Sequence, residues 1–218
     1  YANSATRDLC GILLPDSAKA RTNLGCARSR MGRFQEAIDG FRAAFAQGDR
    51  SATMYSNLAN ACRQAGDLKQ AILNYQRALA LGRTAIELNN LGECLMASGA
   101  YDEARQSFLG ALDIEFQPAV YVNLGFLDVR QERYPRALRY LKKALPYEST
   151  LVPVQRLALH YDLAVVLDRS GERAAAARHA WKAMTILREG HVPPHMNAAA
   201  IEKLAAIADE PAALPSTE

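Results

Sequence analysis

The side chains able to do acid–base or metal chemistry are few and scattered in this chain of 218 residues. The histidines are His160, His179, His191 and His195, and two prolines between the last two prevent them from sharing a helix face. None of the four cysteines stands in the C-x-x-C spacing typical of zinc or redox sites. Neither a glycine-rich phosphate loop nor a Gly-x-Ser-x-Gly elbow occurs. We therefore predict that the chain is not an enzyme and needs no metal or cofactor.

A recurring amide indicates a different kind of chemistry, the recognition of a polypeptide backbone. Asparagine precedes a Leu, or stands at the matching position, in successive segments, and Asp replaces it in the last: Asn23, Asn57, Asn90, Asn123 and Asp162. An amide side chain carries both an acceptor and a donor, so it can pair with one peptide unit whatever the side chain of that unit. The alternative is that these amides bond to their own helix or to a neighbouring helix.

Basic residues accompany this column. Four arginines fall near the predicted ends of the helices that carry the amides, namely Arg30, Arg63, Arg130 and Arg169, and Lys19 precedes Asn23 by four residues. If they face a ligand, they favour an acidic partner segment. The alternative is a solvated helix C-terminus, where the macrodipole favours cations.

The elements that would position these side chains follow from an internal repeat. Three columns advance together by 34, 33, 33 and 39 residues: Leu24, Leu58, Leu91, Leu124 and Leu163; Ala37, Ala71, Ala104, Ala137 and Ala176; and Ala44, Ala78, Ala111, Ala144 and Ala183. A fourth column holds Phe41, Tyr75, Phe108 and Leu141, then weakens to Ala180. Apolar residues within each segment follow the three-to-four spacing of a helix.

Small residues mark where two helices of each segment must approach. Gly or Ala follows the Leu column at Gly25, Ala59, Gly92, Gly125 and Ala164, and we expect the large fourth-column residues to pack against that gap. A glycine that can end a helix in the left-handed conformation divides the segments at Gly32, Gly66, Gly99 and Gly171. Glu132 takes this place in the fourth segment, which predicts strain or a different turn there.

These residues resemble the tetratricopeptide repeat, which has a period of 34 residues with a Leu-Gly pair, an Ala, an aromatic residue and a second Ala at fixed offsets. The resemblance covers roughly residues 18–188. It implies an all-α fold, a right-handed superhelical α-solenoid of helix-turn-helix hairpins with a C-terminal capping helix. It also implies that the first helices line a concave side.

Members of this family carry asparagine ladders on that side, as in the nucleocytoplasmic glycosyltransferase and in chaperone-docking proteins. Lys19, Asn23 and Asn57 match the carboxylate clamp of the chaperone-docking members. Ile86 and Asn90 stand where that clamp has a basic pair, so the match is incomplete.

The expected domain organisation follows from the register. Residues 1–17 are an N-terminal capping segment, and the repeats span 18–51, 52–84, 85–117, 118–150 and 157–190. An insertion at 146–156 explains the step of 39 residues. Residues 194–210 form a capping helix with a polar outer face, and 211–218 form a flexible tail.

Charge and cysteine usage bound the partners and the compartment. The net charge is +3, with no run of like charges, so nucleic acid is not an expected partner, and no apolar stretch is long enough for a transmembrane segment. Cys26, Cys62 and Cys94 fall on successive first helices, too far apart for disulfides, and such unpaired thiols favour a cytoplasmic location.

Three interpretations of function remain open. The first is a non-enzymatic protein–protein interaction scaffold or adaptor that binds an extended peptide or partner segment in the concave groove. The second is a bacterial cell-envelope (lipo)protein that assists pilus or secretin assembly, periplasmic or at the outer membrane, with its anchor removed before Tyr1. The Ala- and Arg-rich composition favours a bacterial source. The third is self-association through the convex faces or the end helices.

Overall fold

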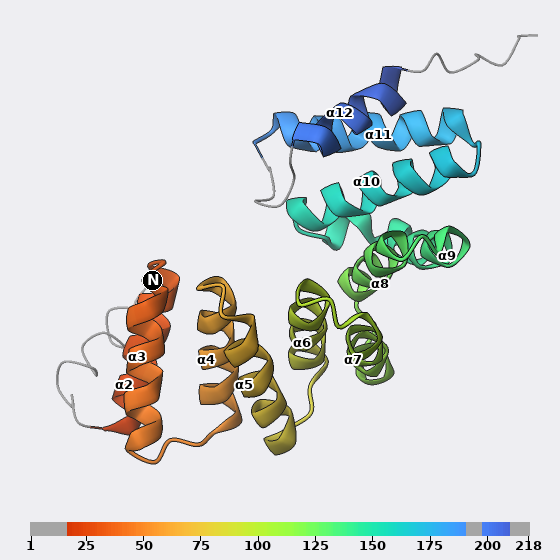
Figure 1. Ribbon diagram of the computed structural model, residues 1–218. Helices are drawn as coiled ribbons and strands as arrows, with labels where there is room; N and C mark the ends of the chain where they lie inside the picture. Colours follow the sequence, from red (N-terminus) through yellow and green to blue (C-terminus); the bar gives the residue numbers. More distant parts are fainter. Residues whose placement is uncertain (1–16, 191–197, 210–218) are drawn as a thin grey trace, which may run out of the picture. The chain divides into compact units, whose positions relative to one another are not determined.

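The computed structural model describes residues 17–190 and 198–209, which are helical apart from short turns (Figure 1). The helices are α2 (Ala18–Arg30), α3 (Phe34–Ala46), α4 (Ala52–Gln64), α5 (Leu68–Leu81), α6 (Ala85–Ala97), α7 (Tyr101–Ile114), α8 (Pro118–Arg130), α9 (Tyr134–Ala144), the 3-10 helix η1 (Leu145–Thr150), α10 (Pro153–Arg169), α11 (Arg173–Arg188) and α12 (Ala198–Asp209). The predicted all-α fold of consecutive helical hairpins is confirmed. The chain divides into two compact units, Tyr1–Glu115 and Phe116–Glu218.

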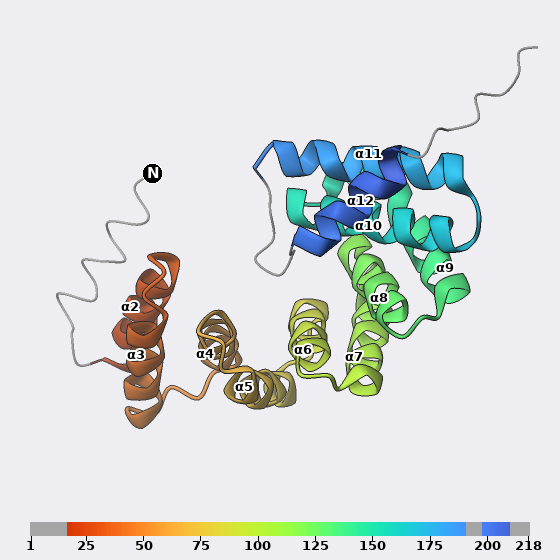
Figure 2. The same ribbon diagram turned by 45° about the horizontal axis from the view of Figure 1, so that its top comes forward.

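The first unit consists of the hairpins α2–α3, α4–α5 and α6–α7, whose paired helices lie side by side in both views (Figures 1 and 2). Between hairpins, α3 packs against α4, and α5 packs against α6. The large residues of the fourth column, Phe41, Tyr75 and Phe108, are fully buried. The core of this unit is therefore built from the columns of the repeat.

The close approach of paired helices depends on glycine, as predicted. A Cβ atom at Gly25 would lie 2.8 Å from Cε1 of Phe41, and one at Gly92 would lie 2.6 Å from Cε1 of Phe108. In the second unit Gly125 faces Leu141 in the same way. These contacts confirm that a small residue on the first helix accommodates a large residue on the second.

The turn inside each hairpin uses the left-handed backbone conformation. The φ angles of Gly32, Gly66, Gly99 and Gly171 are 75°, 85°, 86° and 78°. Glu132 adopts a φ of 55° at the equivalent place, so the fourth hairpin has the same type of turn without glycine. A left-handed conformation at a residue with a Cβ is strained.

The second unit contains the hairpins α8–α9 and α10–α11, joined by η1, with α12 packed against α11 and α10. Arg136 of α9 donates to both carboxylate oxygens of the fully buried Asp128 of α8 at distances from 2.8 to 3.1 Å. This bidentate contact ties the two helices of the fourth hairpin together.

Two predicted boundaries differ from the structure. Helix α10 begins at Pro153, so the segment predicted as an insertion, 146–156, contains most of η1 and the first turn of α10. Proline is favourable at this position because the first N–H groups of a helix have no intrahelical acceptor. The capping helix begins at Ala198 within the described residues, with Leu204 and Ile207 buried. The segments predicted as an N-terminal cap and as a tail lie outside the described residues, except for Ser17.

Burial of the cysteines agrees with small core thiols. Cys62 and Cys94 are buried and Cys26 is half-buried, while Cys10 lies outside the described residues. Burial raises the pKa of the Cys94 thiol to about 11, which makes it a poor nucleophile. Among the described helices, none is both long and apolar enough to cross a membrane.

Candidate peptide-binding surface

Hydroxyl caps determine where the first helices of the first unit begin. The side chains of Ser17, Ser51 and Thr84 accept hydrogen bonds from the N–H groups of Ala20, Met54 and Glu87 at 3.1, 3.2 and 3.2 Å. Such caps stabilise a helix start by about 1 kcal/mol. They also set the rotation of each helix relative to its first residue.

The amides of the first unit share this register. Asn23, Asn57 and Asn90 each stand six residues after the cap of their own helix, on α2, α4 and α6. All three side chains are half-buried. We call these three residues, with Arg30 and Asn60, the first-helix surface. Equal distance from the cap gives the amides equivalent positions on successive helices.

Asn57 joins neighbouring hairpins. Its Nδ2 donates to Sγ of Cys26 at 3.2 Å, across from α4 to α2. Thiol sulfur is a weak acceptor, so this contact orients the amide at little energetic gain. Within the described part of the chain, Oδ1 of Asn57 has no hydrogen-bond partner and remains an acceptor.

A pocket of about 230 Å³ lies beside Asn57 between the first and second hairpins. Its lining consists of Cys26, Ser29, Arg30, Phe41, Asn57 and Asn60. We call it the α2–α4 pocket. The Tyr75 hydroxyl donates to Oδ1 of Asn60 at 2.6 Å, which leaves the N–H groups of that amide as the donors available to a ligand.

The arginines at the ends of the first helices have different surroundings. Arg30 is exposed and lines the α2–α4 pocket, whereas Nη1 of Arg63 forms an ion pair with Glu93 of α6 at 2.9 Å. In the second unit Arg130 and Arg169 are exposed and lie over the rings of Phe126 and Tyr134, at 5.2 and 5.9 Å. The structure therefore brings Arg30 together with the amides and engages the other three elsewhere.

The remaining predicted residues of the first unit lie at the start of this surface. Lys19 is exposed on the first turn of α2, four residues before the half-buried Asn23. Ile86 is 61% exposed on α6, where a clamp of the chaperone-docking type would need a basic residue. A complete clamp is thus not formed.

In the second unit, Asn123 is half-buried on α8, but Asp162 on α10 corrects the prediction. Asp162 was expected to face a ligand, yet its side chain is buried and neither carboxylate oxygen has a hydrogen-bond partner among the described residues. Burial raises the pKa of Asp162 to about 8, while the charge of Arg130 acts in the opposite direction. The substitution of Asp for Asn therefore removes this position from the accessible surface.

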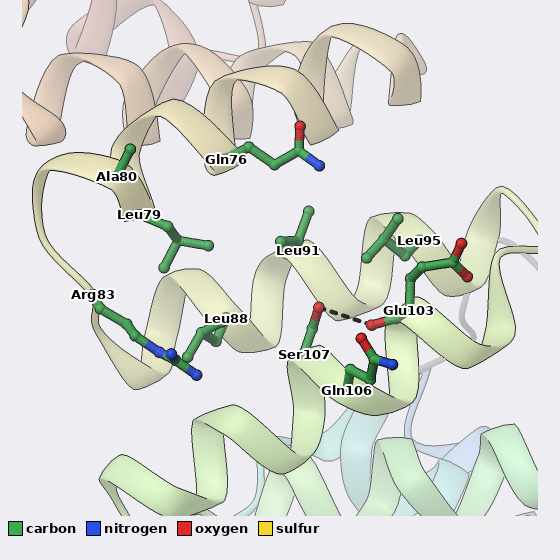
Figure 3. A pocket seen from close by; sticks show the side chains of 10 residues that line it. All are labelled: Gln76, Leu79, Ala80, Arg83, Leu88, Leu91, Leu95, Glu103, Gln106 and Ser107. Atoms are coloured by element: carbon green, nitrogen blue, oxygen red, sulfur yellow. Dashed lines mark hydrogen bonds between the residues drawn. The ribbon is translucent and has the colours of Figure 1, made fainter.

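A second pocket was not expected from the sequence, because the search for ligand-facing residues was restricted to the first helices. It has a volume of about 500 Å³ and lies between α5 and α7, over α6. In Figure 3 Leu79, Leu88, Leu91 and Leu95 gather at its centre. Its polar residues are Gln76, Arg83, Glu103, Gln106 and Ser107, the last of which donates to the carbonyl of Glu103 at 2.9 Å.

Comparison with protein families places the repeat explicitly. Tetratricopeptide repeat models match residues 22–86 and 63–124. No curated protein sequence matches the chain.

Solved structures share the fold at low sequence identity. PilF of Pseudomonas aeruginosa is 23% identical, with a TM-score of 0.68 over 93% of this chain and 89% of that chain. BtubC (BKLC) from P. vanneervenii is 20% identical, with a TM-score of 0.69 over 90% of this chain and 94% of that chain. MamA is 23% identical, with a TM-score of 0.60 over 67% of this chain and 87% of that chain. Identities this low establish similarity of fold alone.

Proposed function

Since the chain belongs to the tetratricopeptide repeat family, we propose that it is a non-enzymatic interaction scaffold whose first-helix surface binds an extended segment of a partner protein. The observation that supports this proposal is the equal cap-to-amide spacing of Asn23, Asn57 and Asn90 on three successive helices. A row of equivalent amides suits a ligand that presents peptide groups at regular intervals.

The spacing of helices and of an extended chain agrees with this use. Packed helices lie about 8–10 Å apart, and an extended chain advances about 3.3 Å per residue. One amide could therefore meet roughly every third residue of a bound segment. Each hydrogen bond contributes about 1 kcal/mol net, so several are needed for useful affinity.

The test uses peptides selected for binding by display of random 12-residue sequences. Their affinity is measured by fluorescence anisotropy for the unaltered chain and for Asn57→Ala with Asn90→Ala. Loss of two hydrogen bonds is expected to weaken binding roughly thirtyfold. Circular dichroism should show an unchanged helix content.

A matched control separates the two surfaces of the first unit. Gln76→Ala with Gln106→Ala removes two amides from the pocket between α5 and α7 and should leave peptide affinity unchanged. If the control weakens binding and the asparagine variant does not, the ligand lies on the second helices and the proposal fails.

A second candidate is the envelope role predicted from the composition, assistance in pilus or secretin assembly in a bacterium. Its support is the likeness to PilF over nearly the full length of both chains. Immunodetection of the native protein in cytoplasmic, periplasmic and outer-membrane fractions of the source organism tests it. Recovery in the cytoplasmic fraction alone would reject this candidate and leave the scaffold proposal standing.

A further inference from the structure

We infer that the α2–α4 pocket binds a carboxylate group of the partner segment, a proposal that rests on the proposed function of the first-helix surface. The ligand chemistry is a carboxylate borne by a polypeptide, either an Asp or Glu side chain or the C-terminal carboxylate. The argument comes from the donors in the pocket and from the contents of the equivalent crevices elsewhere in the chain.

The pocket presents mainly donors. Arg30 is exposed and has no acidic partner among the described residues. The hydrogen bond from Tyr75 occupies Oδ1 of Asn60, so that amide offers its N–H groups, and Ser29 adds a hydroxyl. A guanidinium beside amide and hydroxyl donors suits an anion with two acceptor oxygens.

The end of α2 is also less negative than a bare helix C-terminus. The carbonyls of Ala27, Arg28 and Ser29 accept the N–H groups of residues 31–33 at 3.0 to 3.1 Å. These bonds satisfy carbonyl groups that would otherwise repel a carboxylate.

The next crevice along the chain already holds a carboxylate from the protein itself. Between α4 and α6, Glu93 pairs with Arg63 at 2.9 Å. Glu93 stands one repeat after Asn60, and Arg63 lies in the last turn of α4 as Arg30 lies in the last turn of α2. The fold thus accommodates a carboxylate between an arginine at the end of one first helix and the middle of the next.

The second unit repeats the combination in a buried form. Arg130 ends α8, and Asp162 of α10 is close enough for the charge of Arg130 to affect its pKa. Of the crevices between first helices within each unit, α4–α6 and α8–α10 carry their own acid, and α2–α4 carries only amides. Arg30 is therefore the arginine whose carboxylate must come from outside this part of the chain.

The experiment is an NMR titration of the isotopically labelled protein, which requires no identified partner. The probes are N-acetyl-glutamate N-methylamide for a side-chain carboxylate, N-acetyl-glycine for a C-terminal carboxylate, and N-acetyl-glutamine N-methylamide as the neutral control. The Nε–H signal of Arg30 and the side-chain amide signals of Asn57 and Asn60 are expected to shift with at least one carboxylate probe. The probe that binds more tightly identifies the source of the carboxylate.

Two variants test the position of the ligand. Arg30→Gln changes an exposed side chain and should weaken carboxylate binding roughly tenfold without affecting the fold. Asn60→Glu places a carboxylate where Glu93 stands one repeat later, so it should abolish probe binding while still accepting from Tyr75.

A third variant makes the converse prediction. Glu93→Gln frees Arg63, so the α4–α6 crevice should gain a second carboxylate site that perturbs the Nε–H signal of Arg63. Equal shifts with the neutral probe, or unchanged carboxylate binding by Arg30→Gln, would overturn the inference. If the probes fail but the selected peptides still depend on Asn57 and Asn90, the carboxylate site is rejected and the proposed function is retained.

Discussion

The Nδ1 atoms of His160 on α10 and His179 on α11 lie 3.0 Å apart, with the two rings stacked at a centroid distance of 5.2 Å. Nε2 of His160 lies 3.1 Å from a carboxylate oxygen of Glu148 in η1, whose other oxygen accepts from Lys182 of α11 at 3.3 Å. This cluster links the connection η1 to the fifth hairpin. Two protonated rings would place two N–H donors face to face, so the contact requires at least one neutral ring.

The cluster predicts that the second unit loses stability in mild acid. Burial lowers the pKa of His160 to about 4 and also lowers that of His179, against the pull of Glu148 and with the help of Lys182 and Arg178. The unfolded chain, with an ordinary histidine pKa near 6.5, then binds more protons than the folded chain between about pH 6.5 and 4. The contribution of His160 is present above that window and is lost as the pH falls through it.

His160→Leu isolates this effect. Between pH 7 and 5 the free energy of unfolding of the unaltered chain should fall by about 1–2 kcal/mol more than that of the variant. Denaturant titrations followed by circular dichroism at both pH values provide the comparison. An identical pH dependence in the two proteins would show that the histidine contact does not titrate as described.

The buried carboxyl of Asp162 predicts the opposite pH dependence. Because its pKa is raised to about 8, the folded chain holds this proton between about pH 4 and 8 while the unfolded chain releases it. The stability associated with the neutral acid is complete below about pH 4 and is lost as the pH rises through 8.

Asp162→Asn restores the residue of the other repeats and removes this cost. The variant should be more stable than the unaltered chain by about 1–3 kcal/mol at pH 8, since it leaves no buried charge. The difference should shrink as the pH approaches 4. Thermal unfolding at pH 8 and pH 4 measures it, and a difference that does not vary with pH would contradict the assignment.

The left-handed Glu132 predicts a stabilising substitution. A residue with a Cβ in this conformation costs roughly 1–2 kcal/mol that glycine avoids, and the Glu132 side chain is exposed. Glu132→Gly should therefore raise the free energy of unfolding by about 1 kcal/mol. Gly99→Ala at the equivalent turn should lower it by a similar amount, and denaturant titration of both variants would reveal any departure from this opposite pair.

The contact of Gly92 with Phe108 predicts a destabilising one. A methyl group at Gly92 would lie 2.6 Å from the buried ring, so Gly92→Ala should cost about 1–3 kcal/mol. Gly82→Ala serves as the control, because nothing lies within 4 Å of a Cβ there and its φ of −171° suits any residue. Phe108→Leu combined with Gly92→Ala should recover part of the loss, and thermal unfolding compares all three.

Prediction from the sequence succeeded where the signal was periodic. The pairing of Gly25 with Phe41 and the left-handed turns at Gly32 and Gly66 follow from columns that recur along the chain. The start of α10 was misplaced because Pro153 was taken as a helix breaker, although it occupies the first turn. The cap residues Ser51 and Thr84, which explain the register of the amides, were present in the sequence but were not used.

The sequence by itself determined the family, the number and order of the hairpins in its repeated part, and the faces that pack within each hairpin, because these depend on spacing within a few helical turns. Only the tertiary structure decided which side chains of neighbouring hairpins meet. Arg63 finds Glu93 thirty residues away, Asp162 is buried while Asn57 is not, and His160 meets His179. Such pairings depend on how each helix is rotated against the next, a quantity that residue spacing along one chain does not specify.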